Sequence, residues 1–338
     1  PAPGVKLTPS PAARHRDAFA TEALPVTPSF DEADVSDKSR LVRNLGRLSF
    51  EQQEALQQAY QQRLESLLAV DEGVAQIVEA LRDAGELART LIVFTSDNGF
   101  MHGEHRVLPD RGKGWPYEAS VRVPLVLRGL GLPHGRRVQD LVSNTDLAPT
   151  LLHAARAIPD RVVDGRSLLP LARDPLADYG RDLLLASNIF TAIRTDRYVY
   201  VVANKVGREL YDLEADPDQL RSRHRDPALT KVKYELARRL NELSACFGEN
   251  CREDPALRLR LAPLGGSVRA DVGGADAPWV AATRFYVNGK RVAARNRAPF
   301  RAVLAPKHFA TGTATVRVHV ETMDGRGVTM TRTIRLGR

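Results

Sequence analysis

The sequence predicts an α/β core, a small antiparallel α+β subdomain and a C-terminal all-β sandwich, in that order. Three observations support this fold class. A helical apolar pattern over residues 49–85 runs directly into an apolar strand at 91–94, short strands and one helix follow from 183 to 244, and strand alternation begins near 285. With 338 residues, of which 43% are hydrophobic and 27% charged, the chain can bury the cores of two or three domains.

Residues 1–48 are rich in proline and polar residues and show no sustained period, which predicts irregular structure wrapped on other elements. The helix that follows has clear ends, because Ser49 and Gln52 fit a capping box and Gly85 suits the C-terminal stop. One face of this helix is apolar and contains Leu56, Tyr60, Leu64, Leu67, Val74, Ile77, Val78 and Leu81.

The next elements alternate strand and helix. The run Leu-Ile-Val-Phe at 91–94 is apolar throughout, which predicts a strand buried on both faces of a parallel sheet. We expect a second strand at 123–127 and another short run at 140–142. Thr145 or Asp146 then caps a helix, so the side chain of Asp146 is interpreted as a cap and not as a ligand.

From residue 183 onward the pattern changes to short strands separated by turns, with a helix near 228–244. This predicts a small antiparallel sheet covered by one helix. The expected strands are residues 183–186, 191–194, 198–202 and 209–212.

The chain beyond residue 281 predicts a small β-sandwich. Asn288-Gly289 between two apolar runs is a strong hairpin signal, because both residues accept positive φ. Further signals are the alternation of Val316, Val318 and Val320 with polar residues, a turn at 324–325 and a last strand at 328–336. The predicted domains are therefore residues 1–180, 181–252 and 255–338.

Composition excludes several classes of protein. No apolar run approaches the roughly 20 residues that span a bilayer, and the first residues lack the apolar centre of a signal peptide, so a membrane-embedded protein is excluded. The 49 basic and 41 acidic residues give a net charge of +8, which favours anionic partners. The basic residues are scattered, so nucleic acid is not indicated as a partner, and the oligomeric state stays open.

Cys246 and Cys251 are the only cysteines, which excludes a disulfide framework or a cysteine-rich zinc module. A disulfide between them that closes a short loop is the preferred interpretation, and two free thiols are the alternative. Formation of the disulfide would indicate an oxidising compartment.

Asp97 and Asn98 lie in Thr-Ser-Asp-Asn-Gly at the carboxyl end of the strand at 91–94, where open α/β sheets usually bind ligands. Their oxygens suit calcium or magnesium, although an isolated Asp-Asn-Gly is more often only a turn. The same loop continues with a dense set of polar and charged residues, at 100–106, 113–118 and 122. This context favours a site.

These residues resemble the sulfatases, especially secreted bacterial enzymes of the N-acetylglucosamine-6-sulfatase and arylsulfatase type. The main match is TLIVFTSDNGFMHGEHRVLPDRGKGWPYEASVRVPLVL at 90–127. Shorter matches are DEADVSDKSR at 31–40, SNTDLAPTLL at 143–152, DGRSLLPL at 164–171 and ELYDLEADPDQ at 209–219. The resemblance covers residues 1 to about 252, and the tail resembles bacterial immunoglobulin-like domains through RFYVNGKRVA at 284–293.

The resemblance implies a three-layer α/β/α core of the alkaline-phosphatase type, a Ca²⁺ ion and a formylglycine nucleophile that attacks sulfur. It implies that Asp97 and Asn98 are calcium ligands and that Lys113 contacts the sulfate, a role that suits a compact cation. His105 would assist the leaving group or line the pocket, and a surface histidine is the alternative. For His102, His15 and the pair Glu118 and Arg122, a structural role is the preferred interpretation.

The sequence also departs from the family pattern. It contains no C-x-P-x-R or S-x-P-x-R motif from which formylglycine is made, and the opening strand with paired aspartates is absent. We therefore expect an incomplete core, the C-terminal part of a sulfatase whose parent hydrolyses sulfate esters, while these residues alone are inactive and bind calcium weakly.

Two other functions remain open at the level of sequence. A phosphate or phosphonate ester hydrolase of the same superfamily also uses a metal and a cationic cradle, and a non-catalytic protein that binds polyanionic glycans would need no nucleophile. The expected partner is a sulfated small molecule or glycan. The family and the cysteine pair predict an extracellular or periplasmic location.

Overall fold

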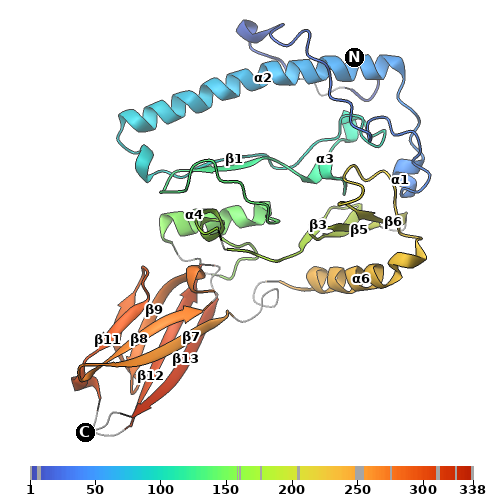
Figure 1. Cartoon of the computed structure of the whole chain (residues 1–338). Coiled ribbons are helices and arrows are strands. Elements are labelled where there is room, and N and C mark those ends of the chain that lie inside the picture. Colours follow the sequence, from blue (N-terminus) through green and yellow to red (C-terminus); the bar gives the residue numbers. More distant parts are fainter. Residues whose placement is uncertain are drawn as a thin grey trace. The chain divides into compact units, whose positions relative to one another are not determined.

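Figure 1 shows the computed structural model of the chain. The structure describes residues 2–5, 9–157, 159, 161–175, 177–203, 206–247, 255–274, 276–309, 313–323 and 326–335. The chain divides into two compact units, Pro1–Gly131 with Gly180–Ser244, and Leu132–Tyr179 with Ala245–Arg338. The first unit contains the calcium, sulfate and histidine candidates named above.

The first unit begins with irregular chain, the short helix α1 (Arg40–Arg43) and the long helix α2 (Phe50–Asp83). The predicted capping box of α2 is confirmed, because the Ser49 hydroxyl accepts a hydrogen bond from the Gln52 backbone N–H and the Gln52 side chain accepts one from the Ser49 N–H. Only the first turns of the apolar stripe are buried, through Leu56 and Ala59.

Strands β1 (Ile92–Thr95) and β2 (Leu125–Arg128) form a two-stranded sheet, with the short helix α3 (Glu118–Val121) between them in the chain. The predicted burial of residues 91–94 in a parallel sheet is wrong for the described chain. β1 pairs with β2 in antiparallel orientation, and Phe94 is 42% exposed. The apolar run indicates an apolar environment for both faces, which the described residues do not provide.

The second sheet of this unit confirms the prediction from sequence. Its order is β3-β4-β5-β6, all antiparallel, and the helix α6 (Thr230–Ala245) lies along one face of it (Figure 1). Leu236 and Leu240 of α6 pack on Ile193, Tyr200 and Leu210 of the sheet. The strands are β3 (Leu183–Ala186), β4 (Phe190–Arg194), β5 (Tyr198–Ala203) and β6 (Gly207–Asp212).

The second unit holds two short helices, α4 (Leu147–Ala155) and α5 (Leu169–Arg173), and no strand forms at the predicted run 140–142. The side chain of Asp146 is buried, but it does not cap α4. Its carboxylate accepts hydrogen bonds from the backbone N–H groups of Ser143 and Arg166 instead, so Asp146 ties the entry of α4 to a later turn.

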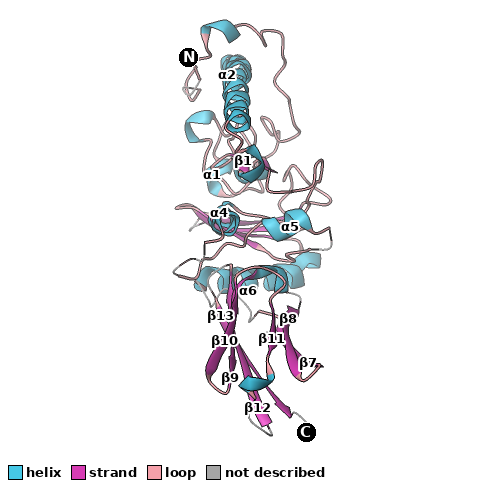
Figure 2. Ribbon diagram, turned by 90° about the vertical axis from the view of Figure 1, so that its left-hand side faces the viewer, coloured by secondary structure: helices cyan, strands magenta, loops and turns pink. Residues whose placement is uncertain are grey.

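The C-terminal part of this unit is a two-sheet sandwich, as predicted (Figure 2). The sheets have the orders β10-β9-β12-β13 and β11-β8-β7. The Asn288-Gly289 hairpin is confirmed, with φ of 49° and 82°, and Val316, Val318 and Val320 are fully buried. The strands are β7 (Leu257–Leu264), β8 (Ser267–Gly274), β9 (Val280–Val287), β10 (Lys290–Arg295), β11 (Arg301–Leu304), β12 (Thr313–Thr322) and β13 (Gly327–Arg335).

Residues 324–325 lie outside the described residues, so the second predicted turn is not tested. Cys251 also lies outside them, and the pairing of Cys246 with Cys251 stays a prediction.

Candidate functional site

Asp97 and Asn98 follow β1 directly, in a tight turn that is held against α3. The backbone N–H groups of Gly99 and Phe100 donate to the carbonyls of Ser120 and Ala119, both at 2.9 Å. A Cβ at Gly99 would lie 2.2 Å from the Ala119 carbonyl oxygen, so only glycine fits the third position of Asp-Asn-Gly. The packing of this turn against α3 therefore fixes the backbone positions of Asp97 and Asn98.

The structure brings Lys113 to Asp97, sixteen residues earlier in the chain. Lys113 Nζ lies 3.5 Å from Asp97 Oδ2, and their side chains are 57% and 75% exposed. The backbone N–H of Asn98 and then the charge of Lys113 lower the pKa of Asp97, which keeps this carboxyl ionised. Asn98 donates its amide group to the Gly99 carbonyl at 2.7 Å, which leaves Oδ1 as its ligand atom.

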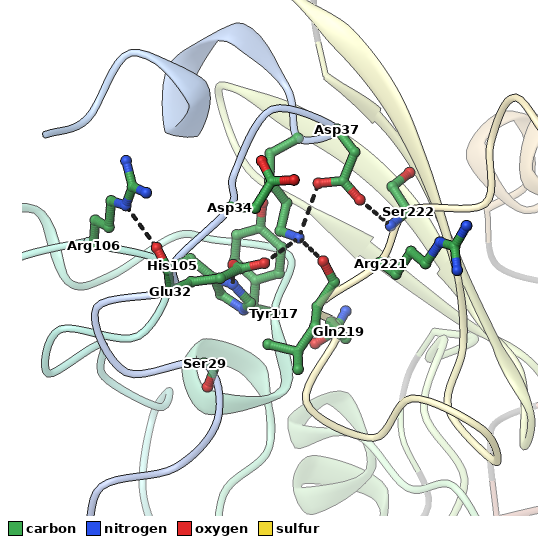
Figure 3. Close-up of polar contacts among 12 residues, drawn as sticks. Ser29, Glu32, Asp34, Asp37, His105, Arg106, Tyr117, Gln219, Arg221 and Ser222 are labelled. Atoms are coloured by element: carbon green, nitrogen blue, oxygen red, sulfur yellow. Dashed lines mark hydrogen bonds and ion pairs between the residues drawn. The ribbon is translucent and has the colours of Figure 1, made fainter. Parts of the chain in front are cut away.

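His105 does not join this pair. Its side chain is 2% exposed, and its Nδ1 lies 2.6 Å from Glu32 Oε2. His105 and Arg106 adopt positive φ, and the Arg106 guanidinium donates to the Glu32 carbonyl (Figure 3). It also donates to the carbonyls of Ala33 and Leu45. The irregular N-terminal segment thus holds the loop at 103–106 through hydrogen bonds. Because the side chain of His105 is buried there, it does not fit direct contact with a substrate.

Lys38 is a buried cation in the same network. Its side chain is fully buried, and Nζ donates to Glu32 Oε1 at 2.9 Å and to the Leu220 carbonyl at 2.6 Å (Figure 3). Asp37 Oδ1 completes its shell at 3.3 Å. Glu32 is therefore shared by Lys38 and His105, and it joins the segments 31–40 and 103–106, while Lys38 joins both to Leu220.

Glu209 of β6 is another buried acid, and it connects the segment before α1 with two tyrosines. It accepts hydrogen bonds from the Ser39 backbone N–H at 2.6 Å and from the hydroxyls of Tyr117 and Tyr211 at 3.0 and 2.7 Å. Burial is the main cause that raises the pKa of both tyrosines. The next cause is the charge of Glu209 for Tyr117, and the neighbouring Tyr117 followed by Glu209 for Tyr211, so both tyrosines stay protonated donors. Tyr117 also packs its ring 4.1 Å from that of His105, measured between centroids.

The remaining residues named from sequence have structural contacts. Glu118 pairs with Arg122 at 4.0 Å, as predicted, and with Arg194 at 2.9 Å. His102 packs edge-on against Phe100 and lies 3.4 Å from an Arg63 nitrogen. Burial and the Arg63 charge lower the pKa of His102 to about 4. His15 lies 2.9 Å from Glu72 of α2.

The sequence did not predict the buried hydrogen-bond network that contains Glu32, Lys38, Tyr117 and Glu209. A signal was present, because each lies in a segment that matches the family, and three are charged residues in DEADVSDKSR or ELYDLEADPDQ. Their connection is between distant parts of the chain, so no local pattern reveals it.

The donor chemistry of Asp97 and Asn98 fits a hard cation, but the number of ligands does not. Calcium takes about six to eight oxygens. Among the described residues, no group of three or more His, Cys, Asp and Glu side chains is placed to hold a metal ion. The site can supply two calcium ligands and is incomplete with the described residues alone.

Two family models match the chain. Residues 11–157 match "Sulfatase", and residues 103–246 match "N-sulphoglucosamine sulphohydrolase, C-terminal". An arylsulfatase of Volvox carteri is 32% identical over 285 residues, which cover 72% of this chain and 44% of the relative. N-acetylglucosamine-6-sulfatase of Homo sapiens is 32% identical over 251 residues, with coverage of 60% and 44%. An extracellular sulfatase SULF-1 homolog of Drosophila melanogaster is 37% identical over 145 residues, with coverage of 43% and 13%.

Solved structures agree on the fold. The protein BT4656, in complex with its substrate D-glucosamine-2-N,6-O-disulfate, has a TM-score of 0.56 at 22% identity and covers 69% of this chain and 62% of its own. A phosphonate monoester hydrolase of Agrobacterium radiobacter has a TM-score of 0.51 at 30% identity, with coverage of 59% and 44%. The fold is therefore the alkaline-phosphatase-like fold of sulfatases.

The chain spans less than half the length of the three curated relatives. None of the helices in the described part of the chain is both long and apolar enough to cross a membrane. The two family models together cover the Asp97 turn, Lys113 and the buried network, and residues 11–246 of this chain therefore belong to the sulfatase family of hydrolases.

Proposed function

We propose that residues 11–246, the sulfatase region, take part in the hydrolysis of a sulfate ester on a carbohydrate, which yields an alcohol and inorganic sulfate. The observation that carries this proposal is the exposed pair of Lys113 and Asp97, 3.5 Å apart beside Asn98. An ammonium group at this position attracts the negative charge of a sulfate ester. The similarity to N-acetylglucosamine-6-sulfatase and to a structure bound to a disulfated glucosamine supports a carbohydrate substrate.

Each residue has a distinct role in this proposal. Asp97 and Asn98 would hold Ca²⁺, which neutralises negative charge on the sulfate oxygens when bound, and Lys113 binds the same sulfate. His105 acts at a distance, as a positioning residue, because its buried contact with Glu32 fixes the loop that leads to Lys113.

The nucleophile must come from elsewhere. Because the sequence lacks a C-x-P-x-R or S-x-P-x-R motif, we propose that formylglycine is supplied by polypeptide outside these 338 residues, which are inactive alone. The sandwich would be an appended immunoglobulin-like module. The location would be extracellular or periplasmic, and the similarity to an extracellular sulfatase homolog of Drosophila supports an extracellular one.

The native protein from its source provides the test. We expect an intact mass well above 37.3 kDa, an upstream peptide that carries formylglycine, and release of sulfate from D-glucosamine-2-N,6-O-disulfate. A mass near 37.3 kDa with no sulfate release would contradict the hydrolase and favour a non-catalytic protein that binds polyanionic glycans.

Substitutions in the native protein test the site. Lys113→Gln should lower kcat/KM for sulfate release by about 100-fold or more, because the lost cation stabilises developing charge. Lys290→Gln on the sandwich is the matched control and should be neutral. Asp97→Asn should weaken calcium binding in calorimetry, and unchanged affinity would remove Asp97 from the metal site.

A phosphonate or phosphate ester hydrolase is the second candidate, favoured by the 30% identity to the phosphonate monoester hydrolase. Both chemistries place a tetrahedral anion against a cation, so Lys113 suits either. Rates on matched aryl sulfate, phosphate and phosphonate esters distinguish them, and a faster phosphonate reaction would replace the sulfate proposal.

A further inference from the structure

A cavity of about 540 Å³ opens on the first unit between α1, the β5–β6 hairpin and the segment at 222–225. Its charged and polar lining includes Asp37, Arg43, Arg208, Ser222, His224 and Arg225. None of the lining residues belongs to the turn of Asp97 and Asn98, and Lys113 is not among them. A cavity of this size accommodates a sugar-sized group.

The wall carries uncompensated positive charge. Arg43, Arg208 and Arg225 come from three different segments, and within the described residues no carboxylate lies within ion-pair distance of their guanidinium groups. Asp37 is the acid of the lining, and its oxygens already accept hydrogen bonds from the Ser222 N–H at 2.5 Å and from Lys38 Nζ at 3.3 Å. The arginines are therefore available to an external anion.

His224 also lines the cavity. Its Nδ1 is buried and has no hydrogen-bond partner among the described residues, while its ring stacks on Tyr200 at 6.2 Å between centroids. Because this nitrogen has no exposed surface, the groups of the wall that can donate to an anion are the guanidinium groups of the three arginines.

The walls are held in place by hydrogen bonds between them. The Arg40 N–H donates to the Val206 carbonyl at 3.0 Å, and the Ser39 N–H donates to Glu209 of β6 at 2.6 Å. Gly207 allows this approach, because a Cβ there would lie 3.1 Å from Ser39 Cα. The short helix with Arg43 and the strand with Arg208 are thus joined next to the cavity.

We propose that this cavity binds the sulfate group of a sulfated saccharide, as a second anion site in addition to the Lys113 site. Planar guanidinium groups match sulfate oxygens in pairs, and a site at a separate position selects saccharides that carry more than one sulfate. The choice of a saccharide as the ligand rests on the proposed function. The prediction that the three arginines bind an anion does not depend on that function.

The test is calorimetric titration of the 338-residue chain with D-glucosamine-2-N,6-O-disulfate and with inorganic sulfate, in the presence of a calcium chelator. The double variant Arg208→Gln and Arg225→Gln should bind the saccharide at least tenfold more weakly. The control is Arg317→Gln with Arg332→Gln, two exposed arginines of the sandwich that change the net charge equally. Thermal unfolding checks that both variants fold.

Equal saccharide affinity in the two double variants would overturn the site, and so would no binding to the unsubstituted chain. If the chain binds inorganic sulfate but does not bind the saccharide, the assignment of a saccharide ligand is wrong. Lys113→Gln separates the two proposals, because it removes sulfate release but leaves the contribution of Arg208 and Arg225 to binding. A catalytically inactive native protein that still shows the arginine effect would contradict only the proposed function.

Discussion

Glu32 stabilises two buried groups at once, the ammonium of Lys38 and the imidazole of His105. A buried ion pair contributes little net free energy compared with apolar packing, but removal of one partner leaves an uncompensated charge and costs about 3–5 kcal/mol. Glu32 thereby joins the segments 31–40 and 103–106, and Lys38 joins both to Leu220. The network therefore acts chiefly on the position of the loop between the Asp97 turn and Lys113.

Glu32→Gln should lower the free energy of unfolding by up to about 3–5 kcal/mol, because Lys38 would stay buried with only the more distant carboxylate of Asp37, at 3.3 Å. Glu235→Gln is the matched control, since the pair of Glu235 with Arg238 is exposed to solvent and contributes little to stability. Urea unfolding of the chain measures both. Similar losses for the two variants would show that the Glu32 network carries no special weight.

His102 makes stability depend on pH. Its folded pKa is about 4 and its ordinary value is 6.5, so the unfolded chain binds the extra proton between these values. The contribution is complete above pH 6.5 and is lost as the pH falls to 4, by up to about 3 kcal/mol. His102→Gln should flatten the fall in stability over this window. Exposed His134→Gln is the control, and parallel curves for the two variants would contradict this assignment.

At the scale of the element, α2 has one continuous apolar stripe, of which the first turns are buried and the rest is largely exposed. Leu56 and Ala59 are buried, whereas Leu67, Val70 and Ile77 on the same face are 52%, 46% and 59% exposed. Phe94 of β1 and Val126 of β2 are also exposed, at 42% and 56%. The helical period is fulfilled along the whole of α2, but burial depends on neighbours that the described residues supply only to its first turns.

Leu56→Ala should cost about 2–5 kcal/mol of unfolding free energy, because a fully buried side chain leaves a cavity. Ile77→Ala should change it by about 0.5 kcal/mol or less, because that side chain is exposed. Denaturant unfolding compares the two. A large loss for Ile77→Ala in the 338-residue chain would show that the exposed part of the stripe is covered in solution.

For the whole molecule, the two compact units differ in the completeness of their cores. Fourteen buried residues form one apolar cluster between the two sheets of the sandwich. The first unit divides its core among smaller clusters and leaves apolar side chains of α2, β1 and β2 exposed. The sandwich should therefore unfold cooperatively by itself, and the sulfatase region should be the weaker part.

Calorimetry of the 338-residue chain should show two transitions, and deletion of residues 255–338 should remove one of them. The remaining part should bind a hydrophobic dye and aggregate on heating, because its apolar faces and strand edges lack cover. One cooperative transition that the deletion leaves unchanged would contradict this division.

The sequence by itself determined the elements whose cause is local. The α2 capping box, the strands of the β3–β6 sheet, the Asn288-Gly289 hairpin and the alternation in β12 follow from patterns within a few residues of one another. The Asp-Asn-Gly turn and Lys113 were also found from sequence, because they lie in one motif.

Tertiary structure decided everything that depends on distant neighbours. It paired β1 antiparallel with β2, buried His105 against Glu32, surrounded Lys38 with oxygens and gathered three arginines around one cavity. An apolar run or a charged residue indicates which environment would stabilise it. It does not indicate which distant segment of the chain provides that environment. Burial and electrostatic interactions act through space, so their outcome was fixed only when the chain folded.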